Sequence, residues 1–197
     1  MSKNKIDMST TEETLYDMKN HILNVSQSIM TVKGIKNTTL KDISKEAGIS
    51  KGTLYYYYSA KDDIIYDIAD RNLNQITSEI LSWVENTADE RLGREILETL
   101  FNKVLEAETR AKLHLYLLNE ATTSNSKLHD KIKNRYKEWY ESIKFGLDKI
   151  ISKDKTKNSA LSYLILSALD GLMIQKMCGI EDPPLKDIVT ILLDEIV

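Results

Sequence analysis

The apolar residues recur every three or four positions along most of this chain, and that spacing places them on one face of an α-helix. Residues 12–33 show the pattern clearly, with Ile22, Val25 and Ile29 on successive turns. Only 7 of the 197 residues are Gly and 2 are Pro, so few positions favour tight turns. We therefore expect an all-α protein of about nine helices without a β-strand.

Short polar or glycine-containing breaks separate the predicted helices, and two prolines, Pro183 and Pro184, precede the last one. In the second half of the chain the breaks fall at residues 121–126 and 152–156. The helices are expected over residues 12–33, 40–47, 51–59, 61–84, 92–106, 112–120, 128–151, 157–177 and 185–197.

Two of the predicted helices are short and meet at a glycine. Thr39 and Ser50 precede them and offer hydroxyl N-caps. Between the helices, Ala47 permits a close crossing, Gly48 accommodates a left-handed backbone, and Ile49 fills the angle. This pattern predicts a helix-turn-helix.

The second short helix has two different faces. At about 100° per residue, Leu54 and Tyr58 fall together and are expected in the core. The opposite side and its edges carry candidate DNA-binding residues. Gly52, Thr53 and Tyr56 are expected near base edges, and Lys51, Tyr55, Tyr57 and Thr39 near phosphates. The four successive tyrosines also suggest a stacking surface for single strands, but a helix turns them to different sides, which disfavours that alternative.

Positive charge is concentrated around this motif. Residues 19–62 hold seven Lys and three acidic residues, a net charge of +4, which leaves −7 for the rest of a chain whose net charge is −3. A run of charged residues is often only a solvent-exposed surface that binds no partner. Because this run of lysines includes the predicted helix-turn-helix, however, we expect the lysines to attract DNA phosphates.

These residues resemble the DNA-binding domain of tetracycline-repressor (TetR) family regulators over about residues 19–65. The matching positions are Gly34, Thr38, Thr39, Ile43, Ala47–Ser50, Gly52–Tyr55, Tyr57, Tyr58, Lys61 and Asp62. Two positions depart from the family pattern, because Tyr58 and Met30 stand where Phe is usual.

The resemblance implies an all-α homodimer with a DNA-binding domain at residues 1–60 and a larger ligand-binding and dimerisation domain at 61–197. It implies that helices 160–177 and 185–196 form the dimer interface and that Lys61 contacts phosphate. The expected function is a repressor that a small-molecule inducer releases from a palindromic operator in double-stranded DNA. Two alternatives stay open: an activator or nucleoid-associated DNA binder controlled by a protein partner, and a helical adaptor that has lost DNA binding.

No motif marks a ligand pocket in the C-terminal part, so only residue types suggest candidates. Aromatic and acidic side chains in otherwise apolar helices suit an apolar or cationic inducer. For each aromatic residue the ordinary alternative is core packing, and for Asp170 we favour a bond across the dimer interface. The candidates for ligand binding are Trp83, Phe101, Tyr116, Glu120, Tyr136, Trp139 and Tyr140, with Phe145, Tyr163 and Asp170 as further members of the set.

The sequence carries none of the catalytic motifs that would indicate an enzyme. His21, His114 and His129 lack metal-ligand spacing and are expected at the surface or its boundary, and Cys178 is expected to be buried. We therefore expect no metal and no cofactor. The first residues lack the apolar segment of a signal peptide, and no run of residues is long enough to span a bilayer, so a cytoplasmic location without membrane contact is expected.

Overall fold

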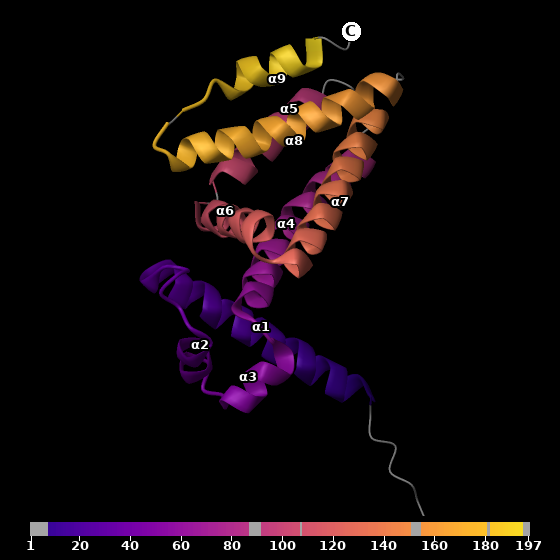
Figure 1. The fold of residues 1–197 in the computed structure, drawn as a ribbon. Coiled ribbons are helices and arrows are strands. Elements are labelled where there is room, and N and C mark those ends of the chain that lie inside the picture. The colour runs from indigo at the N-terminus through magenta and orange to yellow at the C-terminus, as the bar shows by residue number, and fades with distance from the viewer. Residues whose placement is uncertain (1–7, 87–91, 107, 151–154, 181, 195–197) are drawn as a thin grey trace, which may run out of the picture. The chain divides into compact units, whose positions relative to one another are not determined.

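The computed structural model describes residues 8–86, 92–106, 108–150, 155–180 and 182–194. These residues form nine α-helices and no strand, which confirms the predicted all-α class (Figure 1). The helices are α1 (Met8–Lys33), α2 (Leu40–Glu46), α3 (Lys51–Tyr57), α4 (Lys61–Asn86), α5 (Leu92–Glu106), α6 (Glu108–Thr123), α7 (Ser126–Ile150), α8 (Lys155–Met177) and α9 (Leu185–Asp194).

The largest difference from the predicted boundaries concerns α6. It begins four residues earlier than expected and continues to Thr123, through residues that the sequence assigns to a break. The hydroxyls of Thr122 and Thr123 donate to backbone carbonyls one turn back, so these polar residues stay helical at an exposed position. The turn itself is short, because Asn125 accepts from the backbone N–H of Leu128 and caps α7.

The chain divides into two compact units, Met1–Ile68 and Ala69–Val197, and α4 is continuous across that division. In the first unit, α1, α2, α3 and the first turns of α4 surround a small core. Its most buried side chains are fully inaccessible to solvent: Ile22, Ile43, Leu54, Ile64, Ile65 and Ile68. Short helices of seven residues are marginal alone, so this shared core is what holds α2 and α3 in place.

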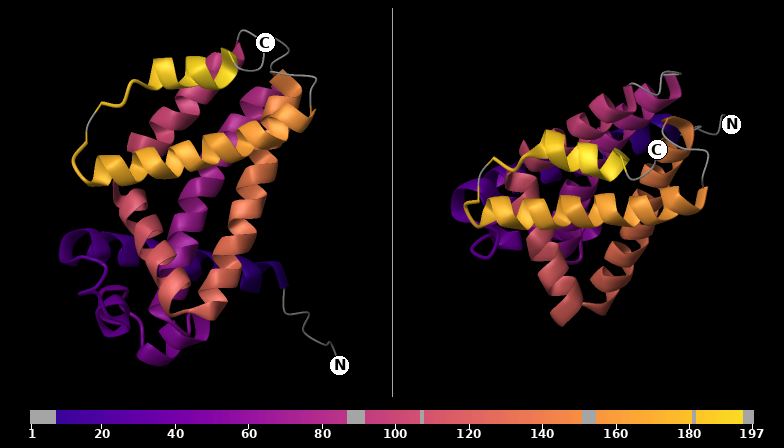
Figure 2. Two further views of the ribbon diagram at one scale, coloured as in Figure 1. Left: turned by 45° about the horizontal axis from the view of Figure 1, so that its top comes forward. Right: turned by 90° about the horizontal axis from the view of Figure 1, so that it is seen from above.

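The second unit is built from the rest of α4 and α5 to α9 (Figure 2). α7 packs against both α6 and α8, and α9 packs against α5. Its main core joins side chains from α5, α7, α8 and α9: Leu97, Phe101, Leu147, Leu161, Ile165, Leu169, Val189 and Leu193. None of the described helices is long and apolar enough to cross a membrane.

Candidate functional site

The turn between α2 and α3 has the predicted caps. Thr39 Oγ1 accepts from the Asp42 backbone N–H at 3.2 Å, while an Asp42 carboxylate oxygen accepts from the Thr39 N–H at 3.0 Å. This is a capping box, which satisfies donors at the start of α2 from both sides. Ser50 Oγ accepts from the Thr53 N–H at 2.9 Å and caps α3, and Gly48 has a φ of 66°, as the left-handed turn requires.

α3 presents the two faces that its periodicity predicts. Leu54 is fully buried and Tyr58, just after the helix, is 3% exposed. On the other side, Tyr55 and Tyr56 are 56% and 74% exposed. The aromatic rings of Tyr56 and Tyr57 pack edge to face, with 5.2 Å between their centres. Lys51 and Gly52 are exposed as well, and Thr53 and Tyr57 are half-buried. The predicted surface residues of α3 therefore form one continuous face.

Tyr58 is held by two residues that the sequence reasoning missed. Its hydroxyl donates to Asp67 Oδ2 at 3.0 Å, and Lys19 Nζ pairs with the same oxygen at 2.8 Å. The Lys19 ammonium also lies 5.5 Å from the centre of the Tyr58 ring. The polar atom that distinguishes Tyr58 from Phe is thereby satisfied, and the end of α3 is tied to α1 and α4. The helical register of Asp67, three residues after the buried Ile64, is the only sequence signal for this role.

The lysines around the motif fall into two groups. Lys19 and Lys33 pair with acids, and Lys61, predicted to contact phosphate, donates to the carbonyl oxygen of Ile35 at 2.8 Å. The other group is exposed and makes no ion pair within the described part of the chain: Lys36, Lys41, Lys45 and Lys51. Bonds from the side chain and backbone of Thr39, followed by one from Lys33, lower the pKa of Asp42 to about 2, so this capping carboxylate stays charged at neutral pH.

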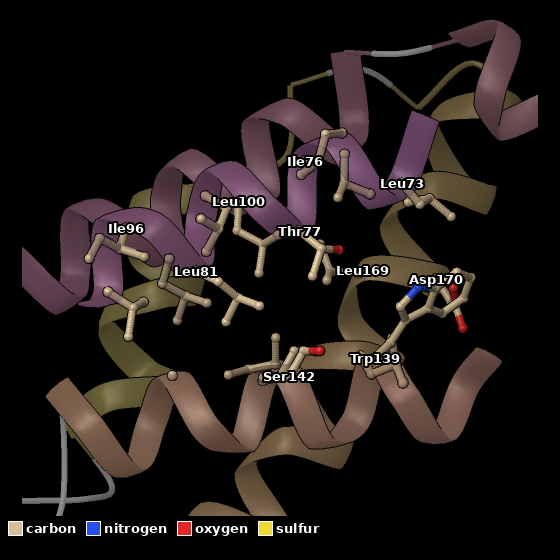
Figure 3. Close-up of a pocket in the computed structure, with 18 of the residues that line it drawn as sticks. Leu73, Ile76, Thr77, Leu81, Ile96, Leu100, Trp139, Ser142, Leu169 and Asp170 are labelled. Carbon is tan, nitrogen blue, oxygen red and sulfur yellow. The ribbon is translucent and has the colours of Figure 1, made fainter. Parts of the chain in front are cut away.

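The second unit contains a cavity of about 130 Å³ between α4, α5, α6, α7 and α8 (Figure 3). Ile96 and Leu81 lie at one end of the close-up, and Trp139 and Asp170 lie at the other. Most of the remaining wall is aliphatic, with Leu73, Ile76, Ile80, Val84, Leu100, Val104, Ile143, Leu147, Leu166 and Leu169 among its members. Such a mainly apolar cavity with few polar groups is typical of small-molecule sites.

The polar end of the cavity is a connected cluster. Tyr136 Oη donates to Asp170 Oδ2 at 2.7 Å, and His114 Nε2 lies 3.1 Å from Tyr136 Oη and 3.5 Å from Asp170 Oδ1. The Trp139 ring packs 5.6 Å from His114 and 5.0 Å from Tyr136 between ring centres. Burial, with the charge and hydrogen bond of Asp170, raises the pKa of Tyr136, so its phenol remains a donor at neutral pH.

Arg110 is the buried cation of this cavity wall. It is only 4% exposed, and its guanidinium donates to the carbonyl oxygens of Lys103 and Val104 in the last turn of α5. Cations are favoured at that end of a helix. Burial lowers the pKa of Arg110 to about 10, which leaves it charged at neutral pH.

Of the seven residues predicted to bind the ligand, only Trp139 lines this cavity. Phe101 is fully buried in the main core, and Trp83 is 44% exposed beneath the Lys103 ammonium. Tyr136 is outside the lining, but its hydroxyl donates to Asp170, which is part of it. The hydroxyl of Tyr140 bonds to Ser159, Glu120 accepts from Ser124, and Tyr116, Phe145 and Tyr163 are likewise outside the lining.

Asp170 lies in the cavity wall, where its carboxylate accepts from Tyr136 of the same chain, and its bond across a dimer interface stays a prediction. Two other sequence expectations in this part of the chain need correction. His114, expected near the surface, is 5% exposed because α6 turns it toward α7 and α8. Cys178, expected to be buried, is exposed just after α8. The burial of Arg110 has no signal in the sequence, because this arginine lies among polar residues at the start of α6.

Known proteins resemble both parts of the chain to different degrees. Residues 22–68 match the family model described as bacterial regulatory proteins, tetR family. The HTH-type transcriptional regulator AcrR of Shigella flexneri is 23% identical over 47% of this chain and 52% of its own length. The HTH-type negative transcriptional regulator IcaR of a biofilm operon in Staphylococcus epidermidis is 28% identical over 67% of this chain and 74% of its own length. The chain thus spans about half the length of AcrR.

The fold also recurs in solved structures. A transcriptional regulator from Saccharomonospora viridis, crystallised in complex with choline, superposes with a TM-score of 0.69 at 23% identity and covers 91% of this chain and 95% of its own. That likeness concerns the fold. With relatives named as regulators of the same type, the helix-turn-helix part of the chain, residues 22–68, matches the tetR family of bacterial regulatory proteins.

Proposed function

We propose that this protein is a transcriptional repressor that binds a palindromic DNA operator as a homodimer and that a small-molecule inducer releases. The observation that carries the proposal is the outer face of α3. Leu54 and Tyr58 anchor this helix in the core, whereas Tyr55 and Tyr56 leave more than half of their surface exposed. The name of IcaR, a negative regulator, supports repression rather than activation.

The proposed DNA contacts follow from the position of each side chain. Thr53 and Tyr56 would contact base edges in the major groove, and Gly52 would let the helix approach closely. Backbone N–H groups at the starts of α2 and α3 support phosphate binding there. We assign phosphate contacts to Thr39, Lys51, Tyr55, Tyr57 and Lys61.

The outward faces of α8 and α9 support dimerisation. Tyr163, Leu164 and Ile174 on α8 are 63%, 58% and 44% exposed, and Ile191 on α9 is 66% exposed. Large apolar side chains gathered on two helices are typical of a protein–protein interface. A second copy of the chain would bury them, and a dimer would place two α3 helices on a palindrome.

The cavity of the second unit is the proposed inducer site. It is lined from five helices, including α4, which continues into the unit that carries the helix-turn-helix. The choline complex of the Saccharomonospora viridis regulator supports a ligand site in this fold. An inducer shifts the protein away from DNA only if it binds the DNA-free conformation more tightly.

The test is selection of bound duplexes from a random DNA pool with purified full-length protein at low and high salt. We expect an enriched inverted repeat, with binding weakened by salt because phosphate contacts release counterions. Tyr56→Ala should weaken that binding by about tenfold or more, the effect of losing one base contact. Tyr16→Ala is the matched control, because Tyr16 is an exposed tyrosine of the same unit but lies on α1, outside α3. A folded protein that enriches no sequence refutes the proposal, and enrichment of many unrelated sites indicates an architectural DNA binder.

A further inference from the structure

The polar end of the cavity holds a hydrogen-bond donor with no acceptor. The indole Nε1 of Trp139 is buried and finds no hydrogen-bond partner among the described residues. Leaving such a donor unpaired costs about 1–3 kcal/mol, so an acceptor on a bound molecule has a large effect there. Figure 3 shows the Trp139 indole extending into the cavity.

Asp170 supplies an acceptor next to that donor. Tyr136 and His114 each contact both Asp170 and Trp139, so these last two residues lie close together. The Tyr136 hydroxyl donates to the carboxylate and the Tyr136 ring packs against the indole at a tilt, and His114 contacts both groups at longer range. A carboxylate has about four lone-pair positions, so Asp170 retains capacity for another donor after its bond to Tyr136. The cavity therefore offers one N–H and one carboxylate at the same end.

The charges around the cavity disfavour an ionic ligand. Asp170 is its acid and Arg110 its buried cation, and both line the wall. These two opposite charges offset each other, so the wall carries no net charge that would favour either a carboxylate or an ammonium, and either ion would lose its hydration in a largely aliphatic site. A hydroxyl avoids that penalty, because it donates and accepts in one small uncharged group.

We propose that this cavity binds an uncharged, mainly hydrophobic phenol or alcohol, whose hydroxyl donates to Asp170 and accepts from the Trp139 indole. The apolar body would lie along α4 and α7, past the hydroxyls of Thr77 and Ser142, which face the cavity from those two helices (Figure 3). A volume of about 130 Å³ suits a single substituted ring, since an engineered apolar cavity of about 150 Å³ binds benzene. This inference rests on the proposed inducer site and specifies its ligand class.

Four probes of similar shape separate the ligand classes by calorimetric titration into full-length protein: para-ethylphenol, para-ethyltoluene, para-ethylbenzylamine and para-ethylbenzoate. We expect para-ethylphenol to bind about tenfold more tightly than para-ethyltoluene, because only the phenol satisfies the buried N–H. Equal affinities for these two probes overturn the inference. So does tighter binding of the amine or of the benzoate, and so does the absence of binding by every probe.

The two tryptophans provide a matched pair of variants. Trp139→Phe removes the N–H but keeps an aromatic body, and we expect it to abolish the preference for the phenol while para-ethyltoluene still binds. Trp83→Phe changes an exposed residue outside the cavity lining and should leave both affinities unchanged. Asp170→Asn keeps an acceptor for Tyr136 and should weaken phenol binding selectively, which covers the case in which Trp139→Phe does not fold. An unchanged phenol preference in both cavity variants overturns the inference.

Operator release is then measured separately with the same probes. Phenol binding that leaves the DNA complex intact contradicts the inducer role of the site but supports the ligand class. Release by all hydrophobic probes alike, without a phenol preference, supports the inducer role and overturns the ligand class.

Discussion

Replacing Tyr58 with Phe tests how the end of α3 is fixed. The ring is 3% exposed and would stay packed, so the substitution removes one hydrogen bond and creates no cavity. A bond to a charged acceptor contributes about 1.5–3 kcal/mol when its partner is left unsatisfied. In the Tyr58→Phe variant, Asp67 would still have its ion pair with Lys19, whose ammonium lies 2.8 Å from Asp67 Oδ2. The Asp67 side chain is also 25% exposed, so water can replace the phenol. We therefore expect a loss below that range, about 1 kcal/mol.

The measurement is urea unfolding followed by far-ultraviolet circular dichroism. The midpoint should fall while the m-value stays constant, because the surface exposed on unfolding is unchanged. In a chain of this length a loss of about 1 kcal/mol lowers Tm by roughly 2–4 °C. Tyr56→Phe removes an exposed hydroxyl and should change the free energy of unfolding by less than about 0.5 kcal/mol. If Tyr58→Phe is as stable as the wild type, the Asp67 bond does not hold α3.

Two further predictions concern backbone strain and alkaline stability. Gly48→Ala should destabilise the first unit by about 1–2 kcal/mol in the same assay, because φ is 66° there, and Gly48→Asn should cost less; equal losses would point to a steric cause. The raised pKa of Tyr136 keeps its phenol protonated in the folded state. The stability that this pKa shift contributes to the folded protein is therefore fully present below the unfolded pKa of about 10 and is lost as pH rises above it. Tyr136→Phe should flatten that alkaline fall in Tm, and an unchanged pH profile would contradict the assignment.

The fold was largely predictable because its signals are local. The starts of α2 and α3 depend on Thr39 and Ser50, whose capping bonds form within three residues. The two faces of α3 follow from helical periodicity alone, with Leu54 inward and Tyr56 outward. The end of α6 was missed because Thr123 is polar yet bonded to its own helix, which composition does not reveal.

The cavity was much less predictable, because it depends on which helices converge. Aromatic content selected Trp139 but equally selected Phe101, and only packing separates a cavity wall from a core. Arg110 and His114 lie on one face of α6, four residues apart, and become a polar wall only where α7 and α8 meet them. Sequence periodicity indicates that a face is buried, but it does not identify its partner.

The helix α4 both lines the cavity and begins next to the helix-turn-helix. Leu73, Thr77 and Leu81 of α4 line the cavity, and the same helix begins at Lys61, whose ammonium holds the carbonyl oxygen of Ile35 ahead of α2. Between these points, Asp70 of α4 pairs with Arg135 of α7, one turn before Trp139. A molecule in the cavity therefore contacts α4 directly, and any displacement of α4 from α7 must act against the Asp70–Arg135 pair. Under the proposed inducer role, that ion pair is one of the contacts that a ligand would have to outweigh in order to shift α4.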